Sequence, residues 1–149
     1  MKQIPNTYTS GNCFFCGPRN PIGLRLTFYE TETEPNEVVC RLVPSSLYAG
    51  YGKILHGGIQ SGLFDEIMGW FSLVLTGQLG VTGSLQIEFL KPVYVEQEIE
   101  VRCQATSQEG ARVNFSAEIT DQARTVCTRA TGTYILVEED RFKRLVGEE

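Results

Sequence analysis

Basic residues are in short supply in this chain. Its 149 residues include 13 lysines and arginines against 18 aspartates and glutamates, which gives a net charge of -5. Duplex nucleic acids are bound through cationic side chains that displace counterions, so we expect no nucleic-acid partner. Long apolar runs are missing too. The longest, around residues 67–75, is far short of the ~20 residues that span a bilayer.

The first twelve residues also lack an apolar core, so the sequence predicts no secretory signal. Together with the short apolar runs, this indicates a soluble, cytoplasmic protein without a membrane partner. Hydrophobic residues make up 42% and charged residues 21%, which excludes a disordered chain. The length suits one domain over residues 1–149. Within it we expect a loop over residues 1–23 and a charged, peripheral tail over residues 138–149.

Histidine is nearly absent, and the number of cysteines is odd. His56 is the only histidine, and an odd cysteine count without an export signal argues against a disulfide framework. Cys13 and Cys16 form a CxxC pair. A structural zinc site usually takes four ligands from two such pairs, and a redox pair is expected at a helix start, whereas residues 17–21 are turn-forming. We interpret the pair as structural or incidental. Metal binding, shared between subunits or not, is the second alternative, and redox chemistry is the third.

Alternating apolar and polar residues predict six strands, and helical periodicity predicts one helix from Gly57 to about Thr76. The first two strands form a hairpin, and the last four form an antiparallel meander. The predicted fold is α+β, with a curved antiparallel sheet in the order ββ-α-ββββ wrapped around one long central helix. The expected strands are 24–28, 37–43, 81–90, 99–105, 113–119 and 124–137.

The central helix is apolar around most of its circumference. Small residues occupy the remaining side, and two of them are glycines, which cost roughly 0.5–1 kcal/mol each relative to alanine in a helix interior. We therefore expect a partner helix or a ligand to approach the helix backbone there. The broad apolar side carries Ile59, Leu63, Phe64, Ile67, Trp70, Phe71, Val74 and Leu75, and the small side carries Ser61, Gly62, Asp65, Gly69 and Ser72.

Asp65 and Glu66 are the only charged residues between His56 and Glu88. Because an unpartnered ion in a core is costly, two alternatives remain. Either the helix reaches the surface and both acids are solvated, or one carboxylate works in a cleft as a base or nucleophile. Asp65 is the better candidate because it lies on the small-residue side, where a ligand can approach. Glu66 lies closer to the apolar side and is expected to bond to the sheet.

His56, Gly57 and Gly58 stand at the start of this helix. The first N–H groups of a helix have no intrahelical partners and carry a partial positive charge, and glycine lets a ligand reach them. Such a start suits an anion or a developing oxyanion. The alternative is a glycine-rich helix entry in which His56 serves as a cap or a packing residue.

Residues 56–69, HGGIQSGLFDEIMG, resemble the central segment of hotdog-fold acyl-CoA thioesterases, and the most similar branch is the phenylacetic-acid-pathway (PaaI-like) one. NCFFCG at 12–17, followed by NPIGL at 20–24, is similar to the N-terminal segment of many members. Residues 82–92 resemble the strand after the central helix, which typically ends in a basic residue and proline, here Lys91 and Pro92. The resemblance covers about residues 12–137.

The resemblance implies a thioesterase that needs no cofactor or metal, with coenzyme A entering as part of an acyl-CoA substrate. Asp65 would be the general base for water or the nucleophile on the thioester, and the Gly57 N–H would polarise the thioester carbonyl. In the family the two usually come from different subunits, so a homodimer or a dimer of dimers is expected. Thr82 would help to place the water, and His56 would orient the loop or the substrate.

Further substrate contacts are assigned to five residues, and one position departs from the family pattern. Gly50 stands six residues before His56, where some members carry an asparagine that contacts the reacting region. The acyl group is left open among aryl, short-chain and medium-chain types. The assigned contacts are Gly58, Gln60, Glu66, Ser84 and Lys91; the candidate phosphate-binding cations are Lys91, Lys53, Arg41, Arg19 and Arg144; and the aromatic side chains that could close the pocket are Trp70, Phe71, Phe89, Tyr94 and Tyr48.

Two other functions stay open. A hotdog dehydratase or hydratase would act on 3-hydroxyacyl or enoyl thioesters through His56 and Asp65. In dehydratases, however, the histidine loop is followed by a proline-rich segment rather than by two glycines that lead into the helix. The second alternative is a non-catalytic acyl-CoA-binding module.

Overall fold

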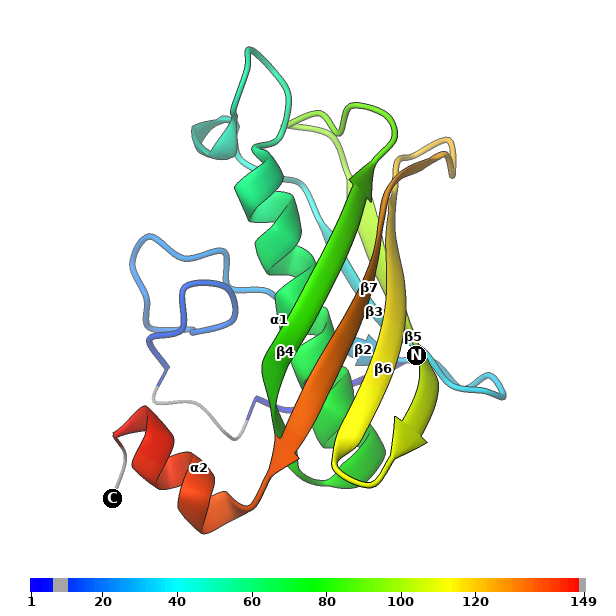
Figure 1. The fold of residues 1–149 in the computed structure, drawn as a ribbon. Helices are drawn as coiled ribbons and strands as arrows, with labels where there is room; N and C mark the ends of the chain where they lie inside the picture. Colours follow the sequence, from blue (N-terminus) through cyan, green and yellow to red (C-terminus); the bar gives the residue numbers. More distant parts are fainter. Residues whose placement is uncertain (7–10, 148–149) are drawn as a thin grey trace.

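Helix α1 (Gly57–Thr76) lies along one face of a curved antiparallel sheet (Figure 1). The computed structural model describes residues 1–6 and 11–147. Over these residues the sheet has seven strands in the order β1-β2-β3-β5-β6-β7-β4, against about six expected. The α+β hotdog architecture is confirmed. The strands are β1 (Lys2–Gln3), β2 (Tyr29–Glu30), β3 (Val38–Leu42), β4 (Leu79–Phe89), β5 (Ile99–Glu109), β6 (Arg112–Thr120) and β7 (Val126–Val137).

Capping residues define both ends of α1. At its start, His56 Nδ1 accepts a hydrogen bond from the Gly58 N–H at 2.8 Å. At its end, Gly77 takes the left-handed conformation with a φ of 71°, and its N–H donates to the Leu73 carbonyl. The predicted helix, Gly57 to about Thr76, is confirmed. A 3-10 helix, η1 (Ser46–Tyr48), precedes α1. Among the described residues, no helix is long and apolar enough to cross a bilayer.

The core lies between α1 and the sheet face that it covers. Phe71 of α1 contacts Phe115 of β6 with ring centroids 5.5 Å apart, and Phe115 meets Tyr134 of β7 edge-on at 5.7 Å. The helical wheel is wrong near the C-terminal end of α1. Ser72 is fully buried because Gly80 of β4 leaves room for its hydroxyl, whereas Leu75 is 41% exposed.

The expected four-strand meander is correct for β5, β6 and β7 and wrong for β4. Strand β4 pairs along its length with β7, from Leu79 opposite Val137 to Phe89 opposite Thr128. The chain then crosses to the middle of the sheet, where β5 pairs with β3. Alternation along one strand reports which face is buried but not which strand lies alongside, so the meander was the wrong choice among antiparallel orders.

The first predicted strand is displaced toward the C-terminus. Residues 24–28 hydrogen-bond instead to the N-terminal segment, with the Leu24 N–H donating to the Phe14 carbonyl and the Leu26 N–H to that of Phe15. Arg25 has a φ of 51°, which interrupts an extended strand. The hairpin with β3 is confirmed, but its first strand is β2, and β1 within the expected loop pairs with it. The charged tail forms α2 (Glu139–Val146), which buries no residue.

The N-terminal segment packs against α1 beside the sheet (Figure 1). A Cβ placed on Gly62 would lie 1.9 Å from Cζ of Phe15, so this ring occupies the space that the missing side chain leaves. Gly62 therefore serves the close approach of the chain's own N-terminal segment, rather than of a partner helix or a ligand. By contrast, a Cβ on Gly69 would meet nothing within 4 Å.

Candidate active site

Asp65 lies near the middle of α1, and two hydroxyl groups from the sheet meet its carboxylate. The Thr82 hydroxyl donates to Oδ1 at 2.5 Å, and the Tyr134 hydroxyl lies within hydrogen-bonding distance of the same oxygen. The Tyr134 hydroxyl is also 2.8 Å from the Asp65 backbone carbonyl. Thr82 and Tyr134 face each other across β4 and β7. The sheet therefore fixes one carboxylate oxygen of Asp65 from two adjacent strands.

A β-bulge turns Thr82 toward the helix. The pairing of β4 with β7 shifts between Thr82 and Ser84, which leaves Gly83 as the extra residue. Regular alternation would put Thr82 and Ser84 on the same face, as the sequence pattern suggested. Instead, Thr82 faces α1, while Ser84 pairs with Thr133 and lines a hollow on the other face of the sheet. A glycine inside a strand is the sequence signal that marks such a bulge.

Tyr134 is a site residue that the sequence analysis missed. It is 1% exposed and stands in the alternating pattern of β7 like any core residue. The pKa of Tyr134 is raised well above its usual range, mainly by burial and to a lesser extent by the hydrogen bond to Asp65. The phenol therefore stays protonated and remains a donor. A phenol that points inward needs a polar partner, and this requirement is the signal that could have paired it with Asp65.

A cavity of about 290 Å³ opens beside the Asp65 carboxylate. Its polar wall is formed by Asp65, Thr82 and Tyr134. Its apolar wall is formed by side chains of α1, among them Trp70, and by one side chain of β4. Gly69 and Gly80 add backbone surface without a side chain. Among the described residues, the lining includes no lysine or arginine. The remaining lining residues are Cys13, Cys16, Glu66, Leu73 and Leu79.

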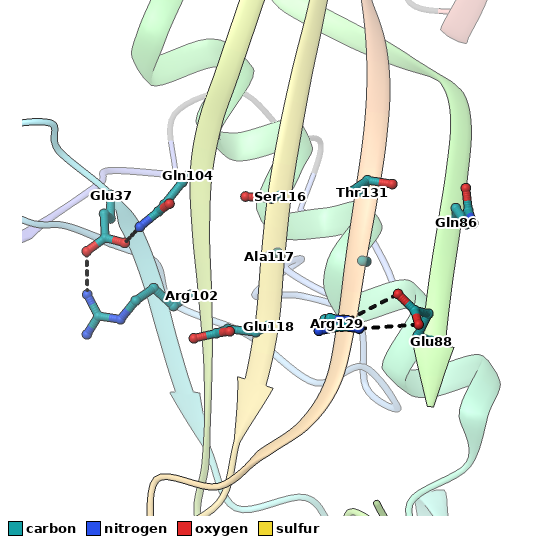
Figure 2. Close-up of a pocket in the computed structure, with 11 residues that line it drawn as sticks. Glu37, Gln86, Glu88, Arg102, Gln104, Ser116, Ala117, Glu118, Arg129 and Thr131 are labelled. Carbon is teal, nitrogen blue, oxygen red and sulfur yellow. Dashed lines mark hydrogen bonds and ion pairs between the residues drawn. The ribbon is translucent and has the colours of Figure 1, made fainter. Parts of the chain in front are cut away.

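A larger hollow of about 530 Å³ lies on the opposite face of the sheet, with α1 behind the strands (Figure 2). Charged side chains in it pair with one another, as Arg102 does with Glu37 at 3.0 Å and Arg129 with Glu88 at 3.1 Å. None of the expected site residues lines it. We therefore take the smaller cavity beside Asp65 as the candidate active site.

The glycine-rich start of α1 leaves one donor free. His56 Nδ1 takes the Gly58 N–H, so His56 acts as a helix cap in this chain. The Gly57 N–H has no hydrogen-bond partner among the described residues, and a Cβ on Gly57 would stand 3.4 Å from the Phe89 ring. Gly57 precedes Asp65 by eight residues, which corresponds to about 12 Å along a helix. One thioester group cannot reach both within a single chain.

Two of the expected substrate contacts have partners elsewhere. Gln60 is 3% exposed; its amide donates to the Leu55 carbonyl at 3.0 Å and accepts from the Thr128 hydroxyl at 2.6 Å. It ties the start of α1 to β7 and does not line the cavity. Glu66 lines the cavity, but it bonds to the N-terminal segment and to its own helix rather than to the sheet. Its Oε1 accepts from the Cys13 thiol at 3.6 Å and from the Trp70 indole at 3.3 Å.

The five candidate cations all lie outside the cavity. Arg41 is paired with Glu100 at 2.9 Å. Lys53 and Lys91 are exposed and near the start of α1. Lys53 precedes His56 by three residues, and Lys91 comes two residues after Phe89, whose ring would lie 3.4 Å from a Cβ on Gly57. These two suit phosphates that approach the helix start better than Arg19 or Arg144 does. Gly50 also lies there, beside the His56 backbone.

Of the five aromatic residues named for the pocket, only Trp70 lines the cavity. Phe71 belongs to the core, where it is 1% exposed. Phe89 and Tyr94 are 56% and 45% exposed, and the Tyr48 hydroxyl donates to the Ile22 carbonyl. Beside Trp70, the apolar lining of the cavity is formed by Leu73 and Leu79 rather than by the other four aromatic side chains that were expected.

One long helix on a curved antiparallel sheet is the architecture of a hotdog fold, and here an acid on the helix faces a cavity. The sequence profile of the thioesterase superfamily matches residues 52–128, which is more than half of the chain. The chain belongs to the thioesterase superfamily.

Individual relatives are distant in sequence. "Verlamelin biosynthesis protein B" of Lecanicillium sp. is 25% identical in an alignment 143 residues long, which covers 78% of this chain and 55% of that protein. The chain therefore spans about half the length of this curated relative. The E. coli PaaI protein of the phenylacetic acid degradation operon superimposes with a TM-score of 0.65 at 18% identity, over 68% of this chain and 73% of that one. The smu.793 protein of Streptococcus mutans, bound to acetyl CoA, gives 0.66 at 22% identity, over 74% and 88%. These two structures show the shared fold.

Proposed function

We propose that this protein is an acyl-CoA thioesterase that hydrolyses a small or medium acyl, or aryl-acyl, thioester to the free acid and coenzyme A. The observation that carries the proposal is the Asp65 carboxylate, held by Thr82 and Tyr134 at the edge of a cavity in a member of the thioesterase superfamily. The acetyl CoA bound to the Streptococcus mutans neighbour supports coenzyme A as the carrier.

Asp65 acts on the thioester either as a general base or as a nucleophile. As a base, it takes a proton from water, the water oxygen bonds to the carbonyl carbon, and the C–S bond breaks. The proton then passes to the departing thiolate of coenzyme A. Because both hydroxyl groups bind Oδ1, Oδ2 is the oxygen of Asp65 that is left for the water among the described contacts. Thr82 and Tyr134 thereby orient the base.

The carbonyl oxygen needs a donor as negative charge develops on it, and the Gly57 N–H suits this role. Since Gly57 and Asp65 are about 12 Å apart along α1, the donor must come from a second copy of the chain. Strand β4 stands at the end of the described sheet and offers an eleven-residue edge for pairing. We propose a homodimer joined along β4, in which Asp65 works with Gly57 of the partner subunit.

The cavity limits the acyl group. A volume of about 290 Å³, walled by Trp70, Leu73 and Leu79, suits a short or medium chain or a single aromatic ring. Lys53 and Lys91, near the start of α1, are the proposed contacts for the phosphates of coenzyme A. Gly58 contributes backbone surface at the same helix start, and its N–H is already held by His56.

The test is thiol release from a panel of aliphatic and aryl acyl-CoAs, with wild type beside Asp65→Asn. Asparagine keeps the shape of the side chain and removes the base, so we expect turnover to fall by about 10²–10⁴-fold while the fold stays intact. Glu109→Gln is the matched carboxylate control, because Glu109 is exposed at the end of β5, and it should leave turnover unchanged. Near-wild-type hydrolysis by Asp65→Asn would overturn the assignment.

The same panel separates the two alternative functions. A dehydratase or hydratase would change the absorbance of an enoyl thioester without releasing thiol. Within one chain, His56 caps α1 nine residues before Asp65, which corresponds to about 13.5 Å along the helix axis. His56 Nδ1 also accepts a hydrogen bond from the Gly58 N–H. An acyl-CoA-binding module would bind the panel and release nothing, and this result would refute the hydrolase proposal.

A further inference from the structure

Two cysteines and a glutamate converge on one point of the candidate cavity. The Sγ atoms of Cys13 and Cys16 and a carboxylate oxygen of Glu66 all lie within 4.8 Å of one another. Cys13 and Cys16 belong to the N-terminal segment, and Glu66 is 53 residues beyond Cys13, on α1. Because 53 residues separate Glu66 from Cys13, the sequence alone does not indicate that Glu66 joins the CxxC pair.

We propose that Cys13, Cys16 and Glu66 bind a Zn²⁺ ion that fastens the N-terminal segment to α1. The proposal goes beyond thioester hydrolysis and does not depend on it. Thiolate and carboxylate are both established ligands of zinc, and soft sulfur ligands favour it over magnesium or calcium.

The spacing of the ligand atoms suits a tetrahedral ion. Bond lengths of about 2.3 Å to sulfur and about 2.1 Å to oxygen put the two ligand atoms about 3.6 Å apart. The Cys13 Sγ and the Glu66 Oε1 are 3.6 Å apart. Two sulfur ligands of one ion stand about 3.8 Å apart. Since the three ligand atoms lie within 4.8 Å of one another, side-chain movements of about 1 Å or less would give every pair the spacing of a tetrahedral site.

The backbone of the CxxC turn is already arranged around Cys13. The Cys16 N–H points at the Cys13 Sγ at 3.5 Å, and such a bond supports the charge of a metal-bound thiolate. The Gly17 N–H donates to the Cys13 carbonyl at 2.8 Å, which closes the turn tightly. A Cβ on Gly17 would lie 2.4 Å from the Cys13 nitrogen, so only glycine fits after Cys16.

The carboxylate and the second cysteine are also held in place. The Trp70 indole N–H donates to Glu66 Oε1 at 3.3 Å and orients the carboxylate. The Asn6 side-chain amide donates to the Cys16 carbonyl at 3.0 Å. Outer contacts of this kind reduce the entropy that ligands lose when an ion binds.

The negative charge of the cavity lining also favours a bound cation. Asp65 lines the cavity together with Glu66, and among the described residues the lining contains no lysine or arginine. A divalent cation would balance this negative wall. Because all three ligand side chains line the cavity, the fourth coordination position faces it, where a water or a substrate oxygen completes the tetrahedron.

The test is metal binding by the 149-residue chain, reduced with a phosphine and stripped of metal by a chelator. Zinc content is measured by mass spectrometry of the metal, and Co²⁺ replaces zinc as a spectroscopic probe of thiolate ligation. We expect one ion per chain and a thiolate-to-cobalt absorption band. Uptake of neither ion by the reduced protein would overturn the proposal, and a Cys13–Cys16 disulfide in place of an ion would do the same.

Matched variants assign the ligands. Cys13→Ser and Cys16→Ser should each weaken binding by more than the ~100-fold that losing an outer-shell partner costs, and Glu66→Gln by at least tenfold. Cys127→Ser removes another buried thiol outside the cluster and should bind like wild type. Asp65→Asn should also bind zinc, because in the wild type the Asp65 carboxylate bonds to Thr82 and Tyr134 and not to the cluster, although its turnover of thioesters should be strongly reduced. Binding that survives both cysteine substitutions refutes the site.

Thermal unfolding gives a second measurement that does not depend on spectroscopy. Added zinc should raise the unfolding temperature of wild type and of Cys127→Ser, since an ion that binds only the folded state stabilises it. It should raise the unfolding temperature of Glu66→Gln by less at the same zinc concentration, because this variant binds zinc more weakly, and this isosteric variant is the safest to fold. Equal stabilisation of wild type and Glu66→Gln would exclude Glu66 as a ligand.

Discussion

The Thr82 hydroxyl donates to Oδ1 of Asp65 at 2.5 Å, although 17 residues separate the two along the chain. The contact exists because the bulge at Gly83 turns Thr82 inward at the level of Asp65 on α1. A carboxylate oriented in this way presents its second oxygen in a fixed direction. The bulge in β4 is therefore part of the proposed catalytic arrangement rather than an irregularity of the sheet.

Replacing Thr82 by valine should reduce turnover. Valine keeps the shape of threonine and removes the donor, and a hydrogen bond to a charged group is worth about 1.5–3 kcal/mol. We expect kcat to fall by about 10- to 150-fold, while KM changes little if the acyl group binds elsewhere in the cavity. Thr82→Ser retains the hydroxyl and should stay within a few-fold of wild type. Steady-state thiol release decides, and equal rates for the valine and serine variants would show that Thr82 does not position the base.

Replacing His56 by alanine should destabilise the protein. Its Nδ1 accepts from the Gly58 N–H at the start of α1, and losing such a cap costs about 1 kcal/mol. His56→Asn supplies another capping acceptor and should recover most of the stability. Urea unfolding measures the difference. If alanine and asparagine variants unfold at the same midpoint, the imidazole does not act as the cap.

The same pair of variants separates capping from catalysis. Should His56 only cap α1, His56→Asn will hydrolyse acyl-CoA like wild type. A folded His56→Asn with strongly reduced turnover would instead assign the imidazole a direct role in orienting the substrate.

Replacing Gly62 by alanine should also destabilise the protein, although alanine is the better helix former by about 0.5–1 kcal/mol. The new Cβ would lie 1.9 Å from Phe15 Cζ and would push the N-terminal segment off α1. Gly69→Ala is the matched control on the same helix, because its Cβ enters open space and should raise stability by about 0.5–1 kcal/mol. Thermal unfolding of the two variants should therefore shift in opposite directions, and equal shifts would contradict the packing of Phe15 on Gly62.

Local sequence features were sufficient to predict the bounds of α1 and the candidate base on it, because both depend on residues that are close together along the chain. The bounds of α1 follow from a capping residue at His56 and a left-handed glycine at Gly77, which act within one turn of the helix. Asp65 was singled out because it is an isolated charge on the small side of the helix, and the structure places it at a cavity. The first inference depends on capping at the helix ends and the second on periodicity within the helix, so both depend on a single element.

Features that depend on distant segments could not be predicted. Alternation predicted β4 itself but gave no indication that β7 would be its neighbour. The extra residue Gly83 puts Thr82 on the sheet face that meets α1, and the alternating pattern alone does not predict such a bulge. Glu66 was expected to bond to the sheet, and its actual partner, Cys13, is brought to it only by the path of the N-terminal segment.

Replacing Gly69 by leucine should shorten the acyl groups that the enzyme accepts. Gly69 lines the cavity beside Asp65, and the space around its missing side chain is open, so leucine can enter without displacing the core. A leucine side chain would fill much of a cavity of about 290 Å³ and would remove room for the acyl chain rather than disturb the base. We expect kcat/KM for medium-chain and aryl substrates to fall by about 10- to 100-fold, as one or two methylene-sized clashes require.

Acetyl-CoA should be hydrolysed by Gly69→Leu nearly as well as by wild type, and Gly69→Ala should show a smaller change in the same direction. A uniform loss across all chain lengths would indicate damage to the Asp65 arrangement, whereas no change at any length would place the acyl group outside this cavity.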